Sequence, residues 1–199
     1  MNLPNRLTLL RVLLVPIFMW ILFWEFPYHY LVAGMIFAAA ALTDFFDGKI
    51  ARARGLITNF GKFVDPIADK MLTTAAFIGL MMVGQMNPWA LLLILTREFA
   101  VTSVRLMAAT DGTVIAANFG GKLKTVAQFM AILASIAALE FSTWQTGLLA
   151  GAGLPEAAFS VPLVVTEVLL WVSTILTVLS GIDYVWQNRH FFKEDSAKK

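Results

Sequence analysis

Six apolar stretches dominate this sequence, and each is close to the roughly 20 residues that a helix needs to cross the hydrocarbon core of a bilayer. Hydrophobic residues make up 59% of the 199 residues and charged residues only 14%, whereas soluble domains are about 45–50% apolar and about 25% charged. We therefore predict an all-α integral membrane bundle of six transmembrane helices, forming a single domain over residues 1–199. The predicted spans are 7–26, 30–47, 65–84, 88–110, 123–141 and 161–186.

The basic residues predict the orientation of these spans, because Lys and Arg concentrate in cytoplasmic loops. Ten of the 15 fall at the N-terminal edge, in segments 48–64 and 111–122, and after Trp186. The others lie inside or at the ends of spans and need a separate explanation; they are Arg11, Lys70, Arg97, Arg105 and Lys124. The connections 27–29, 85–87 and 142–160 contain no Lys or Arg. The two sets alternate along the chain, so we expect both termini on the cytoplasmic side of the cell inner membrane. The Lys-rich end, 193–199, is expected to be a flexible, solvated tail.

Residue usage excludes several kinds of site. The chain has no Cys, which removes disulfides, thiolate metal sites and cysteine nucleophiles. Its two histidines, His29 and His190, are far apart in the sequence, so a multi-histidine metal site or a Ser-His-Asp triad is a poor explanation. A signal peptide is not credible, because the first apolar stretch is too long and lacks a small-residue cleavage site. We also expect no nucleic-acid partner.

Four aspartates lie near the ends of two neighbouring spans, at Asp44, Asp47, Asp65 and Asp69. Carboxylates at bilayer depth are costly and usually mark ion, proton or substrate sites. Residues three or four apart share a helix face, so Asp44 pairs with Asp47 and Asp65 pairs with Asp69. The 17 residues between Asp47 and Asp65 form a cytoplasmic turn. The two spans are then antiparallel neighbours, and the two pairs can face each other.

Four oxygen donors at one level suit Mg²⁺ or Mn²⁺ and could hold two ions. Such a site can stabilise both the attacking and the leaving oxygen in phosphoryl-type transfer. Small residues continue the same helix faces and would leave a groove in which a flat ligand approaches the backbone; these are Gly48, Ala51 and Gly61. Arg52, further along the first of these helices, would bring a bidentate phosphate donor to that groove.

The start of the second helix has two possible positions. Asp65-Pro66 resembles an N-cap followed by Pro at the first helical position, which would leave Gly61 in a loop. A longer helix beginning near Asn59 instead places Gly61, Asp65 and Asp69 at one common spacing, and we favour it. A purely structural explanation, in which the acids only cap helices at a wet interface, is adequate for one aspartate but poor for four.

This pattern resembles the signature of the CDP-alcohol phosphatidyltransferase family, with all eight residues and all intervening spacings in agreement. The eight are Asp44, Asp47, Gly48, Ala51, Arg52, Gly61, Asp65 and Asp69. Runs at 2–11, 97–105 and 121–125 are similar to one branch of the family, the bacterial phosphatidylglycerophosphate synthases. The resemblance covers most of the chain up to about residue 140.

The resemblance implies an integral membrane enzyme, usually a homodimer, that transfers a phosphatidyl group from CDP-diacylglycerol to an alcohol and releases CMP on the cytoplasmic side. In this branch the alcohol would be sn-glycerol 3-phosphate. By the family pattern, the four aspartates would hold two divalent ions at the CDP diphosphate. Gly48, Ala51, Arg52 and Gly61 would line the nucleotide groove. Asp69 is the usual candidate for the base that takes the proton from the attacking hydroxyl.

Basic residues inside the fourth and fifth spans suggest where an anionic acceptor binds. Arg97 and Arg105 are eight residues apart, which is about 80° around a helix, and Glu98 lies within about 20° of Arg105. With Lys122 and Lys124 they could form a cage for a phosphate dianion, such as that of sn-glycerol 3-phosphate. The alternative is a structural pair of Glu98 with one of the arginines, together with lysines that snorkel to the interface.

Other interpretations stay open at this stage. Asn5, Thr8 and Arg11 are explained as well by capping and snorkelling as by contact with substrate. The acceptor could be inositol phosphate or serine. An aspartate-rich intramembrane prenyltransferase would also use Mg²⁺ and a diphosphate, but it would not require the Gly, Ala and Arg spacing. A divalent-cation transporter would place its acids near mid-membrane, whereas these lie towards the cytoplasmic ends of their spans.

Overall fold

The computed structural model describes residues 3–54, 59–110, 113, 119–145 and 147–189. The predicted all-α class is confirmed for these residues, which form helices and short connections with no strand among them. The helices are α1 (Leu3–Phe23), α2 (His29–Arg54), α3 (Asn59–Met82), α4 (Pro88–Thr110), α5 (Phe119–Thr143) and α6 (Ala157–Gln187). Each corresponds to one predicted apolar stretch. The largest differences are at the end of α2 and the start of α3, which continue beyond their apolar segments. The proposed tail, 193–199, lies outside the described residues.

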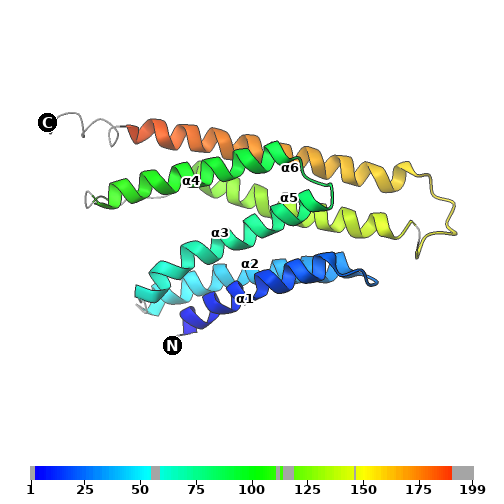
Figure 1. Cartoon of the computed structure of the whole chain (residues 1–199), viewed down its shortest axis with the longest axis horizontal. Helices are drawn as coiled ribbons and strands as arrows, with labels where there is room; N and C mark the ends of the chain where they lie inside the picture. The colour runs from blue at the N-terminus through cyan, green and yellow to red at the C-terminus, as the bar shows by residue number, and fades with distance from the viewer. Residues whose placement is uncertain (1–2, 55–58, 111–112, 114–118, 146, 190–199) are drawn as a thin grey trace.

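The helices lie along the long axis of the molecule, and consecutive helices run in opposite directions (Figure 1). α1 packs against α2 and α3, while α6 packs against α4 and α5; α5 also contacts α2 and α3. The start of α1 and the end of α6 lie at the same end of the bundle (Figure 1). We call this the terminal end, and the end that holds the α1–α2 and α5–α6 connections the far end.

The main hydrophobic core takes residues from all six helices, most of them from α1, α2, α3 and α5. The buried stripe of α1 recurs every three or four residues, as expected for one helix face, and consists of Thr8, Arg11, Val15, Phe18 and Leu22. The ring of Phe18 packs against Phe37 of α2 with centroids 5.8 Å apart, and Phe37 packs against Phe129 of α5 at 5.5 Å. These contacts fix the register between the helices that carry the candidate site.

Gly79 allows α3 to approach α1 closely. A Cβ atom at this position would lie 2.4 Å from Cδ2 of Leu22, closer than atoms tolerate. A larger residue would therefore push α3 away from α1. This contact also fixes the register between α1 and α3, because it places Gly79, near the end of α3, against Leu22, near the end of α1.

Three helices are long and apolar enough to cross a membrane by length and composition, namely α1 from Arg6, α5 from Gly120 and the whole of α6. Shorter apolar segments of α2 and α3 cover His29–Thr43 and Lys70–Met82. Large apolar side chains cover the outside of the bundle, and Trp20, Trp89 and Trp186 are each more than 60% exposed. A surface of this kind is unfavourable in water over so large an area and suits a lipid environment.

Candidate active site

The aspartate pairs of the predicted metal site lie on continuous helices. α2 extends to Arg54 and α3 begins at Asn59, so the prediction of a long second helix is confirmed. The alternative in which Asp65-Pro66 begins the helix is wrong, because α3 passes through both residues without interruption. Gly61 therefore belongs to the first turn of α3. The side chains of the eight signature positions lie outside the described residues, so their contacts stay a prediction.

Arg11 is a buried cation at the level of these aspartates. Its side chain is 0% exposed, so the explanation that it snorkels to the interface is wrong. α1 and α2 are antiparallel and meet at Phe18 and Phe37. Arg11 lies seven residues before Phe18, and Asp44 lies seven residues after Phe37. By helix register, Arg11 is therefore level with Asp44.

The contact between α1 and α3 independently places Arg11 at the level of the aspartates. α1 and α3 run in the same direction (Figure 1), and Leu22 lies against Gly79. Arg11 is eleven residues before Leu22, and Ala68 is eleven residues before Gly79. Arg11 is thus level with Ala68, which is itself fully buried and adjoins Asp69. The role of Arg11 could not be assigned from the sequence, although its spacing shows that it shares a helix face with the other buried residues of α1.

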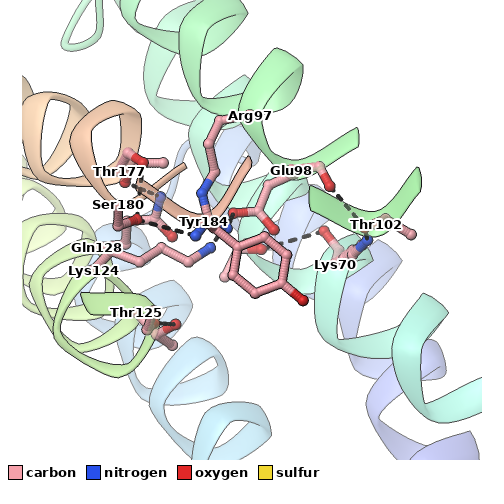
Figure 2. A network of polar contacts seen from close by, with 12 residues as sticks. Lys70, Arg97, Glu98, Thr102, Lys124, Thr125, Gln128, Thr177, Ser180 and Tyr184 are labelled. Carbon is pink, nitrogen blue, oxygen red and sulfur yellow. Dashed lines mark hydrogen bonds and ion pairs between the residues drawn. The ribbon is translucent and has the colours of Figure 1, made fainter. Parts of the chain in front are cut away.

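Arg97, Glu98 and Lys124 form one charged cluster between α4 and α5 (Figure 2). Arg97 Nη1 lies 3.2 Å from Glu98 Oε1, and Lys124 Nζ donates to the same oxygen. Arg97 is 9% exposed and Lys124 is 8% exposed, so Lys124 does not snorkel to the interface. The pair between Glu98 and Arg97 that was predicted as the structural alternative is present. It is not the whole cluster, because Lys124 shares the carboxylate.

α6 holds Arg97 from the opposite side. Arg97 Nη2 donates to Ser180 Oγ at 3.0 Å. Gly181 makes room for the aliphatic part of the side chain, since a Cβ there would lie 2.4 Å from Arg97 Cγ. Arg97 Nε is buried and has no hydrogen-bond partner among the described residues. The guanidinium is therefore fixed in position while one of its donors is left unused.

Arg105 is placed by Tyr184 of α6. Arg105 Nε donates to the Tyr184 hydroxyl at 3.2 Å, and its guanidinium lies 5.4 Å from the centre of the ring. Tyr184 is 2% exposed, so the ring is a fixed support for an arginine that is itself exposed. This role could not be predicted from local spacing, because Arg105 and Tyr184 are 79 residues apart in the chain.

Lys122 is the member of the predicted cage that the structure does not bring to the cluster. It is exposed, whereas Lys124 is buried. Residues two apart on a helix project about 200° apart, so the two lysines point in different directions. Lys122 can act on an anion only through longer-range attraction from the surface.

Lys70 connects α3 to the same region. Its ammonium donates to the Thr102 hydroxyl of α4, and Thr102 donates in turn to the carbonyl of Glu98 at 2.7 Å (Figure 2). A cavity of about 70 Å³ is lined by Lys70, Glu98 and Lys124, among others. Because Lys70 follows Asp69 directly, the charged cluster adjoins the part of α3 that carries the aspartates.

This arrangement has the chemistry of an anion site beside a divalent-cation site. Two cations, Arg97 and Lys124, share the Glu98 carboxylate, and Arg105 lies further along α4 against Tyr184, so positive charge is in excess. Among the described residues no group of three or more His, Asp or Glu is placed to hold a metal ion. The four aspartate side chains lie outside that set. As donors, four carboxylates on two contacting helices fit Mg²⁺ or Mn²⁺, which prefer hard oxygen ligands.

Comparisons with known proteins agree with these features. The family model described as CDP-alcohol phosphatidyltransferase matches residues 1–179. A Bacillus subtilis protein named CDP-diacylglycerol--glycerol-3-phosphate 3-phosphatidyltransferase is 39% identical, over 94% of this chain and 95% of its own length. A Mycobacterium tuberculosis protein named probable phosphatidylglycerophosphate synthase is 45% identical, over 92% of this chain and 80% of its own length.

A Rickettsia bellii protein with the same name as the Bacillus protein is 32% identical over 96% of this chain and 97% of its own length. The match therefore includes the aspartate helices and the cluster of α4 and α5. Ser180 and Tyr184 lie just beyond the segment that the family model matches. With the matched segment, the complete signature and the helical architecture in agreement, the chain belongs to the CDP-alcohol phosphatidyltransferase family.

Proposed function

We propose that this protein transfers the phosphatidyl group of CDP-diacylglycerol to sn-glycerol 3-phosphate, giving phosphatidylglycerophosphate and CMP in phospholipid biosynthesis. The relatives whose names describe this reaction support the proposal over most of their length. The structural observation that carries it is the buried cluster of Arg97, Glu98 and Lys124, connected through Lys70 to the helix that bears Asp69. A buried excess of positive charge is what an acceptor with a phosphate dianion requires.

In this proposal the aspartates Asp44, Asp47, Asp65 and Asp69 hold two divalent ions, Mg²⁺ or Mn²⁺. When bound, such ions supply charge neutralisation for a diphosphate and its leaving group. Arg11, level with Asp44 and Ala68, adds a fixed positive charge that balances part of the aspartate cluster when it is empty.

CDP-diacylglycerol, the donor, occupies a groove lined by small residues. The groove lies on the turns of α2 and α3 next to the aspartates, on the side away from the apolar segments. Gly48, Ala51 and Gly61 leave room for the cytidine ring to approach the helices, and Arg52 donates to phosphate oxygens. The confirmed extension of α2 and α3 supports this, because all four positions lie on helices that reach beyond the apolar segments.

The reaction forms a bond between the hydroxyl oxygen of the acceptor and the phosphorus that bears the diacylglycerol. The bond from that phosphorus to the oxygen bridging to CMP breaks, and CMP takes the electron pair. The hydroxyl proton goes to Asp69. Asp69 precedes Lys70 on α3, so it is the aspartate nearest in sequence to the acceptor cluster.

The acceptor phosphate is held by Arg97, Arg105 and Lys124, with Lys122 contributing only long-range attraction. Glu98 binds both buried cations and holds them in position before the acceptor binds. Serine, which lacks a phosphate, would leave these cations unmatched. Inositol phosphate carries the same charge and is the stronger competitor, but the relatives named for glycerol 3-phosphate favour that acceptor.

We also infer that all six helices cross the membrane, with both termini and the active site on the cytoplasmic side of the inner membrane, and that the protein is a homodimer. The terminal end of the bundle carries the ends of α2 and α4 as well as the start of α3 (Figure 1). Basic segments are confined to that end in sequence, whereas the far-end connections contain no Lys or Arg.

The experiment is CMP release by the purified protein from CDP-diacylglycerol, with glycerol 3-phosphate, serine, inositol phosphate or no acceptor in parallel. We expect release with glycerol 3-phosphate only. Asn at each of the four aspartates should abolish turnover, whereas Arg189→Gln, an exposed basic residue at the same end, should not. Near-normal activity in two of the four Asn variants would defeat the two-ion proposal, and release with serine alone would defeat the acceptor.

A further inference from the structure

A second cavity lies at the far end of the bundle, opposite the candidate active site. Its volume is about 560 Å³, within the roughly 300–1,000 Å³ range of pockets for small organic ligands. Its walls come from the α1–α2 connection and from the end of α5 with the turn that follows, which lie at the same end in Figure 1. Nothing in the proposed transferase reaction uses it.

Two carboxylates line this cavity, and neither has a Lys or Arg partner in the part of the chain that the structure describes. Glu140 is 3% exposed. Its Oε2 accepts from the backbone N–H of Leu31 at 3.1 Å, and its Oε1 accepts from Trp144 Nε1 at 2.9 Å. Both donors are neutral, so they orient the carboxylate but do not balance its charge. Glu25 lies on the opposite wall and is exposed.

The surrounding chain supplies no cation to either carboxylate. Segments 24–30, 83–87 and 143–156 contain no Lys or Arg. Among the described residues neither Glu25 nor Glu140 takes part in an ion pair. A buried carboxylate of this kind is costly unless a positive charge comes close to it. The missing charge points to a cationic ligand from outside the chain.

Aromatic rings form the rest of the wall. Phe26, Tyr28, His29, Tyr30 and Trp144 all line the cavity. The centroids of His29 and Tyr30 are 4.0 Å apart, and those of Phe26 and His29 are 6.0 Å apart. Ring faces attract cations, and quaternary or primary ammonium groups are the organic cations that such walls recognise.

His29 is oriented by the backbone of the α1–α2 connection. Its Nδ1 lies 2.9 Å from the carbonyl oxygen of Phe26. That oxygen can only accept, so Nδ1 carries the proton and, in the neutral ring, Nε2 is left as an acceptor. An ammonium group that enters the cavity would thus meet the two carboxylates, an imidazole nitrogen and ring faces.

We propose that this far-end cavity binds an organic ammonium group, held between Glu140 and Glu25 and enclosed by the aromatic rings. A metal ion is a poor fit, because no three His, Asp or Glu side chains among the described residues are placed close enough together to hold one. The ammonium group belongs either to a small free amine or to the head group of an amine-bearing phospholipid, which the membrane would bring to this end. The proposal does not depend on the transferase activity.

The test measures binding to the full-length protein in lipid nanodiscs. In the first arm the nanodiscs contain only phosphatidylglycerol, and ethanolamine or choline is titrated by calorimetry. In the second arm the nanodiscs mix phosphatidylethanolamine with phosphatidylglycerol, and native mass spectrometry counts which lipid the protein retains. Saturable binding of the amine identifies a free ligand, and selective retention of phosphatidylethanolamine identifies a head group. Either result supports the cavity if it depends on its carboxylates.

Two variants test whether binding depends on the carboxylates. Glu140→Gln should weaken binding by roughly tenfold or more, because a buried charge partner is lost. Glu25→Gln should also weaken it and, being an exposed substitution, leaves the fold intact if Glu140→Gln does not. Glu167→Gln on the outside of α6 is the control and should change nothing. The proposal is overturned if no amine or amine lipid binds, or if Glu25→Gln and Glu140→Gln bind as tightly as Glu167→Gln.

Discussion

Lys124 of α5 donates to the carboxylate of Glu98 on α4, and this bond joins the two helices at the centre of the charged cluster. The lysine is buried and the carboxylate is also bound to Arg97, so two cations depend on one negative charge. The cluster is therefore balanced only in part when empty, and an anion that enters it adds the missing charge.

Removal of the Glu98 charge should show how far this carboxylate neutralises Arg97 and Lys124. Glu98→Gln leaves Arg97 and Lys124 close together without a counter-ion, which should cost about 1–3 kcal/mol of stability. Glycerol 3-phosphate should then raise the melting temperature of the variant more than that of the unaltered protein, because the phosphate replaces the lost charge. Thermal unfolding with and without the acceptor measures both effects. Equal stabilisation of the two proteins would count against an anion site here.

Loss of a cation should affect the acceptor and spare the donor. Lys124→Gln or Arg105→Gln removes a charge-assisted hydrogen bond, typically worth about 1.5–3 kcal/mol. The use of glycerol 3-phosphate should fall by roughly 10-fold to 100-fold. Affinity for CDP-diacylglycerol should change little. Steady-state kinetics with each substrate varied in turn separates the two, and equal losses for both would indicate general damage to α4 and α5 instead.

Gly181 offers a test of how α6 positions Arg97. Gly181→Ala places a methyl group against Arg97 Cγ, 2.4 Å away before relaxation, so the guanidinium must shift and its bond to Ser180 should weaken. We expect a higher KM for glycerol 3-phosphate with a smaller change for CDP-diacylglycerol. Gly151→Ala is the matched control, since nothing lies within 4 Å of a Cβ there. Identical kinetics for the two variants would mean that Gly181 does not position the arginine.

Substitutions that change size but not charge test the donor groove. Gly48→Val or Ala51→Leu should block nucleotide entry while the aspartates remain, because both positions lie on the part of α2 beyond its apolar segment. The expected result is weaker binding of CDP-diacylglycerol with Mn²⁺ binding retained, measured by calorimetry and by electron paramagnetic resonance respectively. Unchanged donor affinity in both variants would place the groove elsewhere.

The helices were predictable from the sequence because apolar length and the three-and-four spacing are local properties. The extension of α3 to Asn59 was predictable for the same reason, since Gly61 and Asp65 share one helical spacing. Arg97 and Lys124 were predicted as one cluster because cations in apolar helices need a polar interior.

Contacts between distant helices were not predictable. The support of Arg105 by Tyr184 and of Arg97 by Ser180 depends on how α6 packs against α4. Arg11 was open to a surface explanation, because the spacing of α1 shows which residues share a face but not that this face is buried. Lys122 is the opposite case. Its nearness to Lys124 in the sequence suggested that both lysines bind one anion, but on the helix the two side chains point in different directions.

The most direct test of the central claim is the identity of the lipid product. The purified protein is incubated with CDP-diacylglycerol, Mg²⁺ and isotopically labelled glycerol 3-phosphate, and the organic phase is analysed by mass spectrometry. We expect labelled phosphatidylglycerophosphate, formed in equal amount to the CMP released and absent with Asp69→Asn. CMP release without label in the lipid, or a labelled lipid that forms equally well with Asp69→Asn, would contradict it.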